Sequence, residues 1–152
     1  MEIIIQQFDK KHLDEAVKLF MDDYSSEDFR YSDQEARNWI SSDLESNPEL
    51  CFEAVDQDGN FLGAQFCYEN KHSTTKSIRL DSLHVKPEFR QHGVGKLLMK
   101  HVLEFAKIND FKLISLMADE TKEFPKNWYE KVGFKPTGWV EYLSDINEIN
   151  FD

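Results

Sequence analysis

The chain has 152 residues, of which 40% are hydrophobic, and its 29 Asp and Glu against 18 Lys and Arg give a formal net charge of −11 at pH 7. The hydrophobic content excludes a disordered chain. The negative charge opposes nucleic-acid binding, because an acidic protein repels polyanions. The length fits one compact domain over residues 1–152. No apolar run reaches the roughly 20 residues that a membrane-spanning helix needs, and the first residues lack the basic start of a signal peptide, so we expect a cytoplasmic protein with no membrane partner.

The first third of the chain predicts a strand followed by two helices. Residues 2–8 form a run rich in β-forming side chains, and an apolar stripe at helical spacing follows from Leu13 to Tyr24. Ser32 and Glu35 have the spacing of a capping box, which predicts the start of a second amphipathic helix that ends before Pro48.

The middle of the chain predicts an antiparallel hairpin. Residues 50–56 and 61–69 flank the stretch from Asp58 to Asn60, whose composition is typical of a tight turn. The two cysteines, Cys51 and Cys67, face each other in one register of this hairpin. A reducing cytosol favours two packed thiols over a disulfide, and no Cys or His lies nearby at metal-ligand spacing, so we expect no metal site.

The second half continues the alternation of strands and helices. The predicted elements are a strand over 77–85, a helix from Val94 to Phe105, a strand over 111–117, a helix over 124–132 that Gly133 ends, and a final strand over 139–143. The polar tail from Ser144 fits either a weak strand or a loose end. Together the elements predict a mixed α/β fold with a mostly antiparallel twisted sheet of six to seven strands, flanked by about four helices.

The segment from Leu83 to Lys96 connects a strand end to a helix start and contains two glycines, Gly93 and Gly95. Amides at a helix start point outward with the positive end of the helix dipole, and they bind phosphate oxygens there. Five basic residues lie in this segment or just after it, in an otherwise acidic chain: Lys86, Arg90, His92, Lys96 and Lys100. An ordinary helix start with a solvated basic face is the alternative. The P-loop and dinucleotide motifs are both absent, so neither common nucleotide site is expected.

These residues resemble a known family. The stretch from Val85 to Gly95 resembles the acetyl-CoA signature of the GNAT acetyltransferases, whose Arg/Gln-x-x-Gly-x-Gly/Ala core is matched by Arg90, Gly93 and Gly95. A later family motif, an aromatic pair followed by Gly-Phe, is matched over residues 128–134. The order of the predicted elements is also similar to that of the family, over nearly the whole chain.

The resemblance implies acetyl-CoA as cosubstrate and the GNAT acyl-CoA acyltransferase architecture. It implies that two neighbouring strands separate and leave a groove for the pantetheine arm, which pairs with the backbone of Leu83 and Val85. It also implies that the backbone amides after Arg90 hold the pyrophosphate. The cofactor-binding residues expected on this basis are Leu83, His84, Val85, Arg90, Gln91, His92, Gly93, Val94, Gly95 and Lys96. The family often has an Asn seven residues before the Tyr of its later motif. Here that position is Lys122, and Asn127 is only a loose substitute.

Direct acyl transfer needs a neutral amine, whereas an alkylamine with a pKa near 10.4 is almost fully protonated at pH 7. The resemblance makes Asp81 the first candidate for the base, acting directly or through a water relay, although Asp81 is equally suited to pair with a Lys or Arg, such as Arg79 or one elsewhere in the chain. His84 competes because its usual pKa lies near neutrality, and strand alternation predicts that it faces away from Asp81. The resemblance also implies that Tyr129 is the general acid for the departing thiolate, with core packing as the alternative.

Acidic and aromatic residues cluster around the connection between the first two helices. The cluster comprises Asp22, Asp23, Glu27, Asp28, Asp33 and Glu35, with Tyr24, Phe29 and Tyr31. Acids beside aromatic rings favour a cation, such as a small-molecule primary amine, a polyamine, an aminoglycoside or a lysine side chain. A solvated helix connection is the alternative.

Two other functions fit the same resemblance. One is a non-catalytic acetyl-CoA-binding regulatory module, against which the retained Tyr129 argues. The other is an acetyltransferase of aminoacyl-tRNA, which the net charge of −11 opposes. The sequence leaves open the acyl-chain preference and the oligomeric state, a homodimer included.

Overall fold

The computed structural model describes residues 1–26 and 30–150 of the chain. They form two compact units, Met1–Met117 and Ala118–Asp152. The expectation of one domain over the whole length stays a prediction. No helix among the described residues is both long enough and apolar enough to cross a bilayer.

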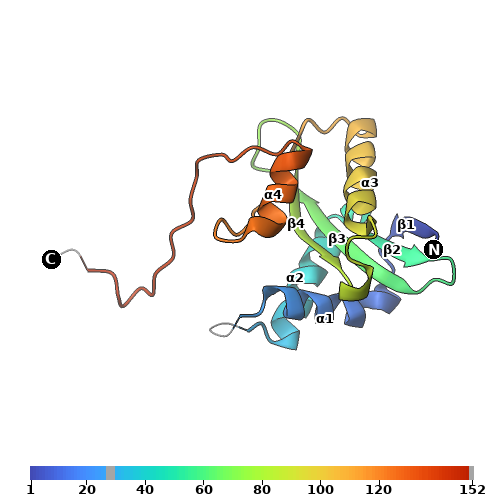
Figure 1. Ribbon diagram of the computed structural model, residues 1–152. Coiled ribbons are helices and arrows are strands. Elements are labelled where there is room, and N and C mark those ends of the chain that lie inside the picture. The colour runs from blue at the N-terminus through green and yellow to red at the C-terminus, as the bar shows by residue number, and fades with distance from the viewer. Residues whose placement is uncertain (27–29, 151–152) are drawn as a thin grey trace. The chain divides into compact units, whose positions relative to one another are not determined.

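The first unit contains five strands and three of the four α-helices found in the described part of the chain (Figure 1). In chain order these elements are β1 (Ile3–Gln7), α1 (Leu13–Tyr24), α2 (Asp33–Ser46), β2 (Phe52–Asp56), β3 (Phe61–Glu69), β4 (Ser77–Val85), α3 (Val94–Ile108) and β5 (Leu113–Ser115). The second unit contains α4 (Glu123–Val132), which Gly133 ends in a left-handed conformation, as predicted.

The five strands form one sheet in the order β1-β2-β3-β4-β5. The first three pairings are antiparallel and only β4 and β5 are parallel, so the expected mixed, mostly antiparallel sheet is confirmed. The predicted final strand over 139–143 is wrong, because in the described residues that segment pairs with no strand. Its Trp139 and Leu143 are 89% and 94% exposed. The sheet therefore has five strands among the described residues rather than six or seven.

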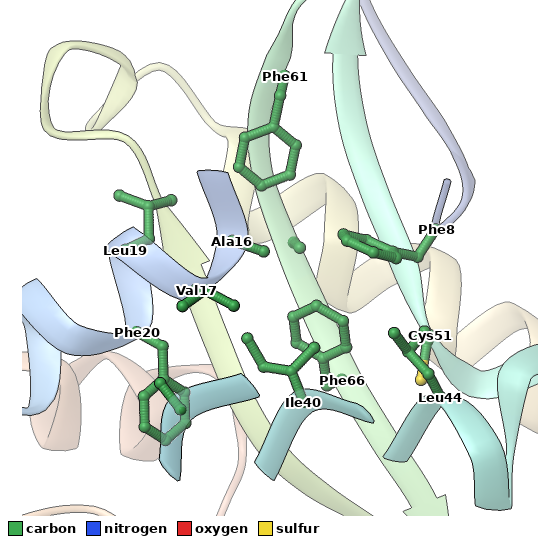
Figure 2. Packing of buried hydrophobic residues seen from close by; sticks show 12 residues of the cluster. Phe8, Ala16, Val17, Leu19, Phe20, Ile40, Leu44, Cys51, Phe61 and Phe66 are labelled. Atoms are coloured by element: carbon green, nitrogen blue, oxygen red, sulfur yellow. The ribbon is translucent and has the colours of Figure 1, made fainter. Parts of the chain in front are cut away.

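The helices cover the two faces of this sheet. Helices α1 and α2 lie on one face and α3 on the other (Figure 1). On the first face, Val17 of α1, Ile40 of α2 and Phe66 of β3 belong to one buried cluster (Figure 2). On the second face, Phe52 of β2 stacks edge-on against His101 of α3 at 4.6 Å. Burial of these apolar side chains holds the helices against the sheet.

The capping box predicted for α2 is confirmed. The backbone N–H of Glu35 donates to Oγ of Ser32 over 3.1 Å, and the Ser32 N–H donates to the Glu35 carboxylate over 2.7 Å. This reciprocal pair satisfies two amides that would otherwise lack acceptors at the helix start.

The hairpin register differs from the one that would join the cysteines. Phe52 pairs with Gln65, so Cys51 is one residue out of step with Cys67. Both thiols are free and buried, and Sγ of Cys51 donates to the Cys67 carbonyl oxygen at 3.8 Å. Burial raises the pKa of Cys51 to about 12, which keeps the thiol protonated and unreactive.

Strands β3 and β4 approach each other closely at Gly63. A Cβ added there would lie 2.5 Å from the carbonyl oxygen of His84 and 3.1 Å from Cα of Val85. Because both atoms belong to the backbone, neither can move away cheaply. We therefore expect Gly63→Ala to lower the free energy of unfolding by about 1–3 kcal/mol, the usual cost of overpacking.

Chemical denaturation measures this effect. Gly95→Ala is the matched control, because its added Cβ would meet side-chain atoms no closer than 3.8 Å. A Gly63→Ala protein as stable as the wild type would contradict the close approach of the two strands.

Candidate active site

Strand β4 has an open edge where it approaches the glycine-containing loop. Strand β5 pairs only with Ser77–Arg79, so within the described residues no strand continues beside 80–85. The Lys86 N–H donates to the Leu62 carbonyl oxygen over 2.9 Å, and antiparallel pairs alternate between bonded and non-bonded. The backbone groups of Leu83 and Val85 therefore point away from β3, toward the open edge.

Arg90 occupies part of this edge. Its Nε donates to the Val85 carbonyl oxygen over 3.0 Å, and its Nη2 donates to Oδ1 of Asp23 over 2.7 Å. An added strand thus has the N–H of Val85 and both backbone groups of Leu83 to pair with. This geometry supports the expected strand-like pairing with the pantetheine arm and gives Arg90 the role of a brace between the loop and α1.

The loop beyond Arg90 turns sharply into α3. Gln91 and Gly93 both have positive φ, of 64° and 84°, and Gly93 is the N-cap of the helix. No side chain caps α3 and its first turn holds no acid. The amides of the first turn therefore keep the full positive end of the helix dipole for an external anion.

The two glycines of the loop have different roles. Gly93 needs its left-handed backbone, which an L side chain would strain. Gly95 has no such need, and a Cβ there would meet only the side chains of Val85 and Leu83 at 3.8 and 3.9 Å. Folding alone does not require glycine at position 95.

The basic residues around the loop are less available than the sequence predicts. Arg90 pairs with Asp23, and Lys86 pairs with Glu15 over 2.5 Å. His92 contacts the Arg90 carbonyl oxygen through Nδ1 at 2.8 Å. Three of the five predicted phosphate partners are therefore engaged by the protein itself. Among the described residues of the loop, the donors that remain available to an anion are therefore mainly backbone amides.

Asp81 and His84 lie on the same face of the sheet, so the prediction that they face opposite sides is wrong. The β3–β4 register pairs Phe66 with Ser82 but Cys67 with Leu80, which leaves Asp81 unpaired in a bulge. An extra residue in one strand resets the alternation of side chains beyond it. Both side chains consequently reach the helices α1 and α2.

The two candidate bases have different surroundings. His84 is 2% exposed, its Nδ1 lies 2.8 Å from Oδ2 of Asp23, and its ring packs edge-on against Tyr24 at 5.1 Å. Nε2 of His84 is buried and makes no hydrogen bond in the described structure. Asp81 instead accepts a short hydrogen bond from the indole N–H of Trp39 and lines a cleft. Arg79, its expected partner, donates to Ser115.

The cleft has a volume of about 780 Å³. It is lined by Tyr31, Glu35, Asn38, Trp39, Ser42, Asp43, Ser46, Asn47, Tyr68, Lys71 and Asp81. Three acids and three aromatic rings thus face one basic residue, Lys71. This composition attracts a cation through both charge and ring faces.

The predicted acidic cluster contributes only partly to this cleft. Tyr31 and Glu35 line it, but Asp23 is held by His84 and Arg90, and Asp33 pairs with Arg37 over 2.7 Å. Asp22 and Tyr24 are absent from the lining. Glu27, Asp28 and Phe29 lie outside the described residues.

Asp43 is the functional candidate that the sequence analysis missed. It is 5% exposed and lies within hydrogen-bonding reach of Asp81. Burial and the neighbouring Asp81 carboxylate raise the pKa of Asp43 to about 8. A signal was present in the sequence, because Asp43 follows Ala36 and Ile40 by seven and three residues and so falls on the apolar stripe of α2.

Tyr129 lies on α4 in the second unit. Its ring contacts Trp128 at 5.1 Å and Phe134 at 5.6 Å, so the residues of the later motif pack against one another. The role of Tyr129 as general acid stays a prediction, as do the roles of Lys122 and Asn127.

Comparison with known proteins identifies the family. The profile of the Acetyltransferase (GNAT) family matches residues 13–134, and the chain belongs to this family. An N-acetylaspartate synthetase from Xenopus tropicalis is 31% identical over 105 residues, which cover 66% of this chain and 38% of that protein. An uncharacterized N-acetyltransferase from Archaeoglobus fulgidus is 28% identical over 130 residues, covering 82% and 88% of the two chains.

Solved structures show the same fold. An aminoglycoside acetyltransferase, AAC(6')-Iy with a CoA-containing bisubstrate analogue, superposes with a TM-score of 0.74 at 19% identity, covering 95% of this chain and 99% of that one. The expected fold is thereby confirmed. The chain spans between 30% and 38% of the length of the first curated relatives it matches, so it corresponds to only one part of those proteins.

Proposed function

We propose that the chain is an N-acetyltransferase that moves an acetyl group from acetyl-CoA directly to the primary amine of a small cationic or lysine-like acceptor. The observation that carries this proposal is the uncapped start of α3 beside the open edge of β4, in a chain of the GNAT family. An amide-rich helix start suits a pyrophosphate and an open strand edge suits an amide-containing arm, and CoA combines both groups.

The donor would bind along this edge. Amides from Gln91 to Lys96 hold the pyrophosphate, and charge-assisted hydrogen bonds of this kind contribute about 1.5–3 kcal/mol each. The backbone of Leu83 and Val85 pairs with the pantetheine arm, which brings the thioester toward the bulge of β4. Asp81 occupies that bulge, only two residues before Leu83.

The acceptor would bind in the acidic cleft. An ammonium group there meets the carboxylates of Glu35 and Asp81 and the rings of Tyr31, Trp39 and Tyr68. One relative is named N-acetylaspartate synthetase. An acidic amine such as aspartate would be repelled by this lining, where Lys71 is the only cation among the described residues, so a cationic acceptor fits better.

The reaction needs proximity more than strong acids or bases. Holding amine and thioester together can supply roughly 7 kcal/mol of the barrier or more. Asp81 accepts the proton of the ammonium, directly or through water, and Tyr129 supplies a proton to the thiolate. The thiolate is already a good leaving group, because its pKa is near 8.5.

Two measurements on the purified chain separate this function from its alternatives. Acetyl-CoA should raise the melting temperature, and thiol release should appear with one or more members of a panel of cationic amines. Stabilisation without turnover on any amine would favour a regulatory module. Binding to tRNA that weakens with salt would favour an aminoacyl-tRNA acceptor instead.

We expect Tyr129→Phe to lower kcat about 10- to 100-fold while leaving CoA affinity unchanged. The expected loss lies at the lower end for a general acid, because the thiolate departs readily. Steady-state thiol release and CoA titration measure the two quantities. Trp128→Phe is the control for ring packing, and full turnover by Tyr129→Phe would remove the general-acid assignment.

A further inference from the structure

Two carboxyl groups from separate elements line the cleft within hydrogen-bonding reach of each other. Asp43 extends from α2 and Asp81 from the bulge of β4, and both line the same 780 Å³ space. Asp43 is 5% exposed, and its Oδ2 has no hydrogen-bond partner in the described structure. Trp39 donates its indole N–H to the other member of the pair, Asp81.

When a buried carboxyl group lies within hydrogen-bonding reach of a second one, both ionise together only at a large electrostatic cost, and a pair of this kind holds one proton between its two members near neutral pH. The shift of the Asp43 pKa to about 8 has this origin: burial contributes most, followed by the hydrogen bond and charge of Asp81. A shared proton also supplies the donor that a buried, unpartnered carboxyl oxygen requires.

We propose that Asp43 and Asp81 act as one proton-accepting carboxyl pair, in which Asp81 contacts the acceptor amine and Asp43 is the positioning residue behind it. This inference rests on the proposed acetyltransferase function. The pair in its doubly ionised form takes one proton from the acceptor ammonium and becomes singly protonated. The nitrogen lone pair then forms the N–C bond, and the C–S bond breaks with its electron pair leaving on the CoA sulfur.

The carboxyl pair lies closer in pKa to the acceptor ammonium than a single carboxylate does. An ammonium with a pKa near 10.4 lies about six units above an ordinary Asp, so transfer to a lone Asp81 is strongly uphill. A pair that binds its proton near pH 8 reduces this gap to about two units. The doubly ionised form is the minority at pH 7, and its fraction rises with pH.

Other titratable groups face the pair and must be considered in any pH profile. In the cleft these are Tyr31, Glu35, Tyr68 and Lys71, and Cys51 and Cys67 interact with both carboxyl charges. Glu49 and Arg79 interact in turn with Cys51 and Tyr68. Burial raises the pKa of Tyr68, Cys51 and Cys67, and the charges of Asp43 and Asp81 raise it further. Those three groups therefore titrate above the pair, and an activity limb near pH 8 belongs to the pair.

Asp43→Asn tests the inference, because Asn keeps the shape and a hydrogen-bond donor but cannot ionise. For the wild type, kcat/KM should rise with pH through about 8. For Asp43→Asn, kcat should fall about 100-fold or more with KM nearly unchanged, and the limb near pH 8 should disappear. Asp43→Glu, which restores a carboxyl, should recover part of kcat and part of the limb near pH 8. Glu45→Gln, an exposed acid-to-amide change on the same helix, should match the wild type.

A second readout does not depend on turnover. Infrared spectroscopy of the wild type should show a protonated carboxyl band that fades as the pH rises through about 8, and Asp43→Asn should lack it. Loss of the band with full kcat and an intact limb in Asp43→Asn would overturn the catalytic pair. Absence of the band from the wild type would overturn proton sharing. Inactivity of the wild type on every amine, with the band present, would overturn the acetyltransferase function and leave proton sharing established.

Discussion

Gly95→Asp is expected to weaken CoA binding about 10- to 100-fold without destabilising the fold. The new carboxylate would lie in the first turn of α3, where it would occupy or repel the donors of the pyrophosphate. Loss of one charge-assisted hydrogen bond costs about 1.5–3 kcal/mol, which corresponds to this range of affinity. The same carboxylate interacts favourably with the helix dipole, by about 0.3–1 kcal/mol.

The opposite signs on binding and stability make this variant informative. Calorimetric titration with CoA measures the affinity, and thermal unfolding without ligand measures the stability. Gly95→Ala separates charge from bulk, because it adds a Cβ with no close contact and should bind CoA nearly as the wild type does. If Gly95→Asp bound CoA as tightly as the wild type does, the pyrophosphate would not bind at the first turn of α3.

Asp81→Asn is expected to lower kcat about 100-fold or more while CoA affinity stays unchanged. Asn cannot accept the proton of the acceptor, and general-base contributions are typically of this size. Its amide still fits the bulge of β4 and removes a like charge from beside Asp43, so the protein should be no less stable than the wild type.

Single-turnover thiol release and CoA titration test this variant. Asp58→Asn, an exposed change in the β2–β3 turn, is the control and should behave as the wild type. Equal kcat in Asp81→Asn and the wild type would remove Asp81 from proton transfer. His84 would then be the next candidate to test, although it is buried against α1 and does not line the cleft.

The parts of the fold that the sequence predicts correctly depend on local signals. The Ser32–Glu35 capping box, the Gly133 helix end and the hairpin turn at Gly59 each act within a few residues. The predicted strand over 139–143 depends on a long-range contact as well, because a strand needs a second strand to pair with. Aromatic and β-branched residues, Trp139, Val140 and Tyr142, give that segment β propensity, but propensity alone does not provide a pairing strand.

The same division holds for the candidate site. The loop proposed to bind the pyrophosphate is local, and its conformation at Gly93 follows from the sequence. The bulge at Asp81 and the bracing of Arg90 by Asp23 join residues from distant parts of the chain, so no sequence spacing reveals them. Asp43 combines a local and a long-range feature. The sequence shows its place on the apolar stripe of α2, but it does not show that Asp81 is its partner.

A mass-spectrometric search for acetylated product tests the proposed acetyltransferase activity most directly. The whole chain is incubated with acetyl-CoA and a mixture of polyamines, aminoglycosides, lysine peptides and acidic amino acids. We expect a cationic amine to gain one acetyl group in step with CoA release, and this product to be lost in Asp81→Asn. Acetylation of an acidic amine alone would contradict the cationic acceptor, and no acetylated amine under any condition would contradict the enzyme itself.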